Sequence, residues 1–431
     1  MTRAPRENPV VITGAGMVTA LGHTVDETWE NLIAGKSGIR AIESFDARGF
    51  ACRVAAQIQE LDSQSFSFPA KSTRIADLPT TMLLKCSQDA HRQGHLDALS
   101  IPRDAIGFFA GMGVVDDKLD DLVPAVLASR RESRAMDMGM FFATGWQKIY
   151  PLFTLSMLNN ISFCLAAIEL DIRGENAVFA PHADAGAQAL IEAVNTLLEE
   201  KSTVALSGGV SEKISAMSLA RGHITDEVNM SAGTEERACR PFASDRAGTV
   251  LGEACAILCL ELRASADARR AGYSTAITGY GQAFGVGEFS SGPTVDAIGN
   301  AMRRALEIAE LAPNDIDVLI AHGDGSKSGD QNELTAIENV FCPSIKKLLV
   351  YSSKAALGHS LAAAAVVDAL LGVAMLEKQL IPPTLPLEGD IDDLPFRLVN
   401  GAPLAAPCRR VMINCRSGQG QAASLVLEKI V

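Results

Sequence analysis

The sequence predicts an α/β protein built from two similar halves, because two distant stretches share one layout. Residues 8–22 (NPVVITGAGMVTALG) form a β-rich run that ends in glycines, and residues 24–38 continue with a helical pattern. Residues 273–292 repeat the strand and glycine pattern and lead into a helical stretch at 294–313 and a strand within 316–325. Alternating strands and helices predict α/β architecture, and the repetition predicts an internal duplication with a seam near residues 262–272.

Composition supports two well-packed halves. Hydrophobic residues make up 48% of the 431 residues and charged residues 21%, which is enough apolar material for a large core. Because aromatic residues contribute only 5%, Ala, Val, Leu and Ile must fill that core. We expect the halves to span residues 1–262 and 263–431, with an insertion near 111–160. Met and Phe recur there at helical spacing, which is typical of a core or a subunit interface.

Charge, cysteine usage and glycine spacing exclude several classes of protein. A net charge of -13 without any basic run argues against a nucleic-acid partner. The nine cysteines are odd in number and include no CxxC pair, so neither a disulfide framework nor a metal site is expected. Cys255 and Cys259 lie in an apolar strand-like run and should be buried packing residues. The glycines of residues 14–22 lack GxGxxG spacing, so no dinucleotide cofactor is expected, and no other cofactor is indicated.

The most hydrophobic segment, residues 360–378, is predicted to form a buried helix. It carries Asp368 in its middle and is too short to span a bilayer. No targeting segment is found either. We therefore expect a soluble cytoplasmic protein that does not associate with membranes.

Four short stretches hold the residues whose side chains could take part in a reaction. His322 directly follows an apolar strand, and Lys354 and His359 lie five residues apart around a glycine at the entry to an Ala-rich helix. Residues 414–428 form a glycine-punctuated loop that feeds the last strand. Residues 179–193 (FAPHADAGAQALIEA) form a strand end, a sharp turn and a helix start, with Ala183 at the corner. Enzymes often mount a nucleophile at such a corner, since backbone N–H groups and the helix dipole converge there.

Taken in this order, the stretches resemble the β-ketoacyl-acyl-carrier-protein synthases of the thiolase fold. The resemblance covers nearly the whole chain and includes residues 10–22, 239–261, 321–330, 352–365 and the Pro-rich 380–390. It implies a duplicated, five-layered α-β-α-β-α fold with two mixed sheets. In this family a Cys at the N-terminus of a buried helix accepts an acyl group from a carrier protein. Two His then stabilise the enolate that forms when a malonyl unit loses CO₂.

The resemblance also assigns roles to individual residues. His322 and His359 match the two enolate-stabilising histidines, and Lys354 matches the lysine near the second of them. Glu253 matches the acidic residue of the family's Gly-Glu block and is expected among the substrate-binding residues.

Two departures from the family pattern concern the reaction itself. The position of the nucleophilic Cys falls on Ala183, because Gly186 matches the family glycine that fixes the register. The family's C-terminal loop carries two phenylalanines, one of which gates the Cys, and these positions fall on Arg416 and Gly418. Both residues are expected to line the substrate site. The nucleophile and its gate are therefore missing together.

Other residues are poor substitutes for the nucleophile. His182 and Asp184 flank Ala183, but neighbours on a tight turn point in other directions. Cys164 lies in a helix expected at the subunit interface. An engineered Cys→Ala replacement would explain Ala183, but not the accompanying departures.

These observations predict a chain-length-factor-like member of the family, which pairs with an active ketosynthase and shapes its acyl pocket. The expected pathway is fatty-acid or polyketide biosynthesis, of the polyene type in the second case. The expected partners are an acyl carrier protein and either a ketosynthase subunit, as a heterodimer, or a second copy of the chain. Two alternatives remain open: a malonyl-carrier-protein decarboxylase, or an ordinary 3-oxoacyl-carrier-protein synthase carrying a Cys→Ala change.

Overall fold

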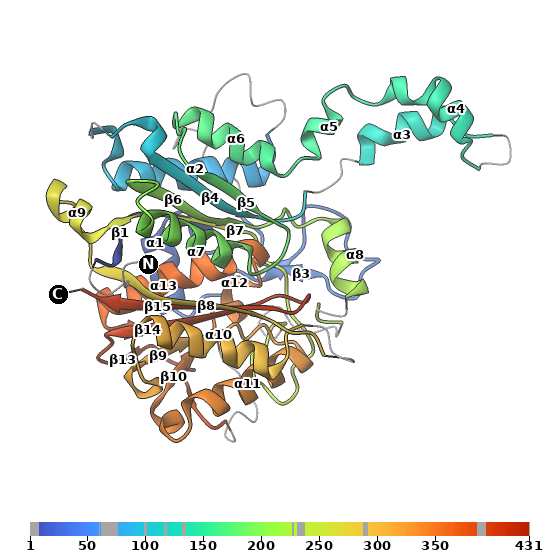
Figure 1. Cartoon of the computed structure of the whole chain (residues 1–431). Helices are drawn as coiled ribbons and strands as arrows, with labels where there is room; N and C mark the ends of the chain where they lie inside the picture. Colours follow the sequence, from blue (N-terminus) through green and yellow to red (C-terminus); the bar gives the residue numbers. More distant parts are fainter. Residues whose placement is uncertain are drawn as a thin grey trace.

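The computed structural model describes residues 8–59, 61, 76–98, 101–115, 119–131, 135–225, 228–230, 238–287, 292–385 and 394–430. Its elements stack in five layers, with helices outside two groups of strands and a further helical layer between them (Figure 1). The expected α-β-α-β-α order is confirmed. The buried apolar side chains of the central layer form the largest core.

The strands of the first half come from five segments: β1 (Val10–Thr19), β4 (Ile106–Met112), β5 (Asn176–Phe179), β6 (Val204–Val210) and β7 (Ala254–Leu262). Three longer helices of this half are α2 (Leu78–Gln93), α6 (Asn160–Glu169) and α7 (Ala185–Leu198). Helices α2 and α6 form the outer layer, whereas α7 lies in the central one (Figure 1). Shorter elements are α1 (Val25–Ile33), β2 (Arg40–Ala41), β3 (Val54–Ala55), α3 (Leu119–Ala128), α4 (Met138–Ala143), α5 (Phe153–Ser156), α8 (Ala216–Ile224) and α9 (Arg263–Arg269).

The second half repeats the arrangement. Its five equivalent strands are β8 (Thr275–Phe284), β9 (Val318–Ile320), β10 (Leu349–Tyr351), β14 (Arg410–Arg416) and β15 (Gln421–Lys429). Helices α10 (Val295–Ile308) and α11 (Lys327–Phe341) form the other outer layer, and α13 (Ala364–Lys378) lies beside α7 (Figure 1). Shorter elements are α12 (Lys354–Leu357), β11 (Leu380–Ile381), β12 (Arg397–Leu398) and β13 (Leu404–Ala405).

Strand pairing shows the duplication directly. In the first half, β1 pairs antiparallel with β7 and β7 with β6, and then β6–β4 and β4–β5 pair in parallel. The second half gives the same sequence of pairings for β8–β15, β15–β14, β14–β9 and β9–β10. The seam expected near residues 262–272 falls on α9, between β7 and β8.

The prediction of two separate mixed sheets needs a correction. Strands β1 and β8 pair through Val10–Ile277 and Val11–Ala276, so the halves join into one 11-stranded sheet. Because this joint spans only two residue pairs, the strands beyond it diverge, and α7 and α13 pack between the two groups (Figure 1).

Helix α13 is buried on nearly all sides, as its uniformly apolar sequence predicts. Asp368 sits inside it and pairs with Nζ of Lys354, which satisfies the one buried carboxylate of this helix. Cys255 and Cys259 are also buried, in β7, as predicted. No helix in the described part of the chain is both long enough and apolar enough to cross a membrane.

The segment predicted as an insertion carries α3, α4 and α5, which extend away from the layered body (Figure 1). Apolar side chains on this arm are exposed, including Leu127 at 57%, Phe142 at 67% and Trp146 at 53%. Within the arm, α3 packs on residues 145–148, where Gly145 approaches Ser129 closely. The arm is therefore ordered while its outer face stays apolar.

Candidate functional site

The corner at Ala183 is built as the sequence predicts. Strand β5 ends at Phe179, and α7 begins at Ala185, whose N–H donates to the His182 carbonyl at 3.1 Å. Gly186 is required in the first turn because a Cβ there would meet the Ala362 carbonyl oxygen at 2.3 Å. Ala183 therefore lies buried just before the N-terminus of α7, and its methyl group has no chemistry for that helix end to activate.

A loop after β9 presents His322 to the same region. The N–H groups of His322 and Gly323 each donate to the Glu333 carboxylate of α11 at 2.8 Å. Asp330 of the same helix accepts the Asp324 N–H at 3.1 Å. Gly323 has φ +38°, a left-handed conformation in which glycine is favoured. Two buried carboxylates of α11 thus fix the loop that carries His322.

The backbone of Arg416, at the end of β14, sets the tautomer of His322. The Arg416 N–H donates to Nδ1 of His322 at 3.3 Å, so a neutral ring carries its proton on Nε2. Burial and the Arg416 charge hold the pKa of His322 well below its ordinary value, which favours the neutral ring. His322 is therefore a hydrogen-bond donor through Nε2.

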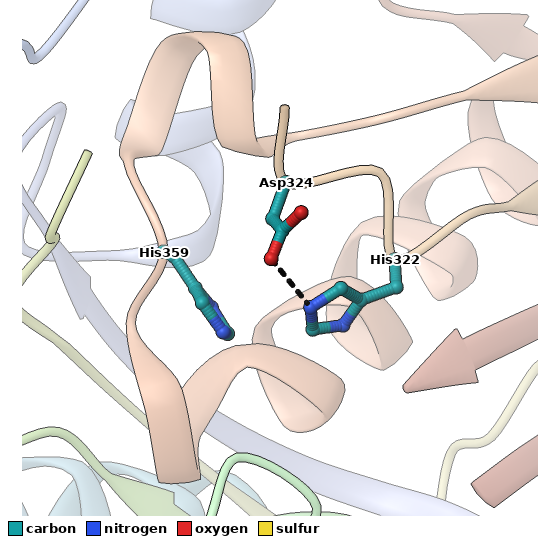
Figure 2. Close-up of side chains that lie close together, drawn as sticks. All are labelled: His322, Asp324 and His359. Atoms are coloured by element: carbon teal, nitrogen blue, oxygen red, sulfur yellow. Dashed lines mark ion pairs between the residues drawn. The ribbon is translucent and has the colours of Figure 1, made fainter. Parts of the chain in front are cut away.

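That donor faces a carboxylate. Nε2 of His322 lies 3.5 Å from Oδ2 of Asp324 (Figure 2), while the Arg416 guanidinium donates to Oδ1 at 2.5 Å. The same guanidinium donates to the Ser326 hydroxyl at 2.7 Å. Burial acts to raise the pKa of Asp324, but the Arg416 charge and the contact with His322 outweigh it and hold that pKa well below its ordinary value. Asp324 is therefore an ionised, buried carboxylate.

His359 completes the group from the turn between α12 and α13. Its ring packs edge-on against that of His322, with centroids 4.8 Å apart, and it points toward His322 and Asp324 (Figure 2). Gly358, with φ +65°, makes the turn that brings His359 back to the β-bridge with Leu251. Burial lowers the pKa of His359 to about 4, so this ring is also neutral near pH 7.

A cavity of about 610 Å³ gathers most of the predicted site residues. Ala183, His322, His359, Arg416 and Gly418 all line it. The halves contribute through equivalent loops, because Ala183 follows β5 and His359 follows β10. These segments lie far apart in sequence and are brought together by the duplicated fold.

Lys354 and Glu253 lie outside the described lining of this cavity. Nζ of Lys354 is buried against Asp368, and Ser353 donates to the same carboxylate at 2.6 Å. Glu253 accepts the N–H groups of Ile58 and Ile214, each at 2.8 Å, and so ties two loops to the start of β7. This geometry favours a structural role for both residues, and a substrate contact of Glu253 remains a prediction.

The acidic residues that organise the site were not predicted. Asp324, Asp330 and Glu333 follow His322 within eleven residues, and Asp324 also lines the cavity. The sequence pattern His-Gly-Asp-Gly could have identified Asp324. In the structure, the Asp324 side chain points toward the ring of His322 (Figure 2).

The donor atoms of His322, Asp324 and His359 lie within 4.8 Å of one another and are of types that bind transition metals. Two contacts work against a cation at this point. The Arg416 N–H keeps the proton of neutral His322 on the nitrogen that faces the group, and the Arg416 guanidinium already neutralises Asp324. The expectation of a metal-free site remains a prediction.

Comparisons with known proteins agree with this geometry. Residues 7–266 match the model of the β-ketoacyl synthase N-terminal domain, and residues 275–388 match that of the C-terminal domain. The chain is 28% identical over 378 residues to the 3-oxoacyl-[acyl-carrier-protein] synthase 2 of Staphylococcus aureus (strain COL), covering 87% of each chain.

Two solved structures share the fold. A β-ketoacyl synthase from Burkholderia phymatum superposes with a TM-score of 0.84 at 26% identity, covering 98% of this chain and 100% of the other. The ishigamide ketosynthase/chain length factor gives a TM-score of 0.82 at 24% identity, with the same coverage. By its two domain matches and this fold, the chain belongs to the β-ketoacyl synthase family.

Proposed function

We propose that this chain is a non-condensing β-ketoacyl synthase homologue that serves as a chain-length-factor-type partner of an active ketosynthase. The pathway would be fatty-acid or polyketide biosynthesis, of a polyene type in the second case. The observation that carries the proposal is Ala183, a methyl group at the N-terminus of α7 in the cavity that also holds His322 and His359. Without a nucleophile there, the chain cannot hold an acyl group as a thioester.

No nearby thiol replaces the missing one. Sγ of Cys415 contacts the Ala183 carbonyl oxygen at 3.1 Å, but Cys415 lies outside the described cavity lining. Burial raises the pKa of Cys415 far above its ordinary value, so its thiol stays protonated and unreactive. Cys164 lies exposed on α6 and does not belong to the corner at Ala183.

The arm supports the partner role. Leu127, Phe142 and Trp146 expose apolar surface on α3, α4 and the turn that follows, which is typical of a surface that another subunit covers. The ishigamide structure pairs a ketosynthase with a chain length factor, and this chain shares its fold. Under the proposal, the partner's Cys receives the acyl group from an acyl carrier protein, and this chain contributes to the enclosing surface.

A second candidate is a malonyl-carrier-protein decarboxylase. The observation that favours it is the retained pair of neutral histidines, whose rings lie 4.8 Å apart in the cavity, with Nε2 of His322 as a donor. Decarboxylation needs stabilisation of an enolate but no covalent acyl-enzyme. If the chain were instead an ordinary synthase carrying a Cys→Ala change, Ala183→Cys should restore full condensation.

Co-expression with an intact ketosynthase from the same genome tests the proposal. Native mass spectrometry should show a stable heterodimer, and recovery of homodimers alone would contradict the partner role. Phe142→Asp and Trp146→Asp should weaken the heterodimer by placing charge in its apolar contact. Phe284→Asp is the matched control, because Phe284 is 69% exposed at the end of β8 and should leave the heterodimer intact.

A further inference from the structure

The two histidines of the site share their cavity with an anion that belongs to the chain itself. Asp324 is only 5% exposed, and its Oδ2 lies 3.5 Å from Nε2 of His322 (Figure 2). Donor atoms of Asp324, His322 and His359 all lie within 4.8 Å of one another. The carboxylate is therefore within reach of both rings.

Arg416 holds this carboxylate in place from the opposite side. Its guanidinium donates to Oδ1 of Asp324 at 2.5 Å and to the Ser326 hydroxyl at 2.7 Å. Its backbone N–H donates to Nδ1 of His322. The Arg416 side chain thus fixes the Asp324 carboxylate. The Arg416 backbone keeps the proton of His322 on Nε2, the nitrogen that faces this carboxylate. The Asp324 N–H donates to the Asp330 carboxylate of α11, which holds the loop after β9 in place.

We propose that the Asp324 carboxylate occupies the place of an enolate oxygen beside His322 and His359, and so blocks decarboxylation of malonyl thioesters by this chain. The Asp324–Arg416 ion pair is an internal plug of the site. Its carboxylate lies 3.5 Å from the Nε2 donor that a substrate oxygen would need.

The chemistry of decarboxylation explains why this placement is inhibitory. The bond between C2 and the carboxylate carbon of the malonyl thioester breaks, CO₂ leaves, and the electron pair passes to the thioester oxygen of the enolate. A proton from water then adds to C2 and gives the acetyl thioester. Donors aimed at the enolate oxygen lower the barrier. Here one donor faces Asp324, whose carboxylate takes the space beside Nε2 of His322 where an enolate oxygen would have to lie.

This block is separate from the loss of the nucleophile. Ala183 prevents formation of an acyl-enzyme, whereas Asp324 prevents formation of the carbanion. The inference therefore does not depend on the proposed partner role. It argues against the decarboxylase as a second candidate function, and it predicts that Ala183→Cys alone does not restore condensation.

Asp324→Ala tests the inference, since it removes the side-chain oxygens that fill the place of the enolate oxygen, whereas Asn would keep an oxygen of the same size there. Incubated with malonyl-carrier protein, this variant should release CO₂ at least about tenfold faster than the unaltered chain. Adding His322→Ala should abolish the gain. If the unaltered chain releases CO₂ as fast as Asp324→Ala, or the folded variant shows no gain, the inference is wrong.

Glu212→Gln is the matched control, because Glu212 also lines the cavity and pairs with an arginine, Arg221, at 2.7 Å. It should give no gain in CO₂ release. Asp324→Ala leaves the Arg416 charge buried, so the double variant Asp324→Ala/Arg416→Gln provides a form without either charge, and it should show the same direction of change. Circular dichroism and thermal melting establish that each variant is folded.

Calorimetry on the unaltered chain gives a readout that does not depend on these variants. Malonate should not bind between the histidines, because Asp324 already fills that place. Malonate binding that His322→Ala removes would show that the donors are available and would overturn the inference.

Discussion

At the scale of single residues, the buried ion pair between Lys354 and Asp368 makes a strong prediction about stability. Both side chains are almost fully buried, and Ser353 donates to the same carboxylate. Asp368→Asn would leave the Lys354 ammonium buried without its counter-charge, which costs about 3–5 kcal/mol of unfolding free energy. Urea unfolding measures this loss.

The surface pair of Lys378 with Asp26 is the matched control for that variant. Its atoms lie 3.3 Å apart, but Asp26 is 79% exposed, so Asp26→Asn should cost less than about 1 kcal/mol. An Asp368→Asn variant as stable as Asp26→Asn would contradict the structural role given to Lys354.

His359 makes stability depend on pH. Burial lowers its pKa to about 4, whereas an unfolded histidine titrates near its ordinary value of 6.5. The unfolded chain therefore binds the extra proton first, so this contribution to stability is complete above about pH 6.5 and is lost as the pH falls toward 4. The expected loss from His359 between pH 8 and pH 5 is about 2 kcal/mol.

Comparison with His359→Gln isolates this effect, because glutamine does not titrate. Urea unfolding at pH 8 and pH 5 should show a smaller drop in stability for the variant than for the unaltered chain. Equal drops in the two proteins would mean that His359 is not held neutral by the fold.

The family resemblance predicted seven site residues. The structure brings five of them to one cavity, whereas Lys354 and Glu253 lie outside its described lining. The resemblance did not predict the role of Asp324. The reason is physical: the contact depends on the conformation of a loop that two α11 carboxylates fix, and on a guanidinium from β14, more than 90 residues away.

At the scale of elements, close backbone approach decides where the site lies. Gly209 of β6 faces the turn at residues 361–363, and a Cβ there would meet the Ala362 carbonyl oxygen at 2.3 Å. Gly209→Ala should therefore push this turn away and cost about 1–3 kcal/mol of unfolding free energy.

Gly272→Ala provides the comparison, because a Cβ at Gly272 meets no atom within 4 Å. It should change the unfolding free energy by no more than about 0.5 kcal/mol. If thermal melting shows equal effects for the two variants, the packing of residues 361–363 against β6 is not the constraint described here.

The elements themselves were largely predictable, because strands and helices alternate with clear periodicity and Gly marks their ends. The arm was predicted only as a segment with Met and Phe at helical spacing. Such spacing is compatible with a core or with an interface. Only the folded structure shows that Phe142 and Trp146 are exposed.

At the scale of the whole molecule, duplication is what assembles the site. Equivalent loops after β5 and β10 deliver Ala183 and His359, and the loop after β9 delivers His322. The repeated layout was visible in the sequence. The joining of both halves into one sheet was not, since the β1–β8 contact involves only two residue pairs.

A condensation assay with purified components is the most direct test of the central proposal, that this chain is a partner which does not itself condense. The chain alone, given acyl- and malonyl-carrier protein, should yield no 3-oxoacyl product, while its complex with the co-expressed ketosynthase should yield it. Replacing the ketosynthase's nucleophilic cysteine by alanine should abolish the product. A 3-oxoacyl product from the chain alone, or from the complex lacking that cysteine, would contradict the proposal.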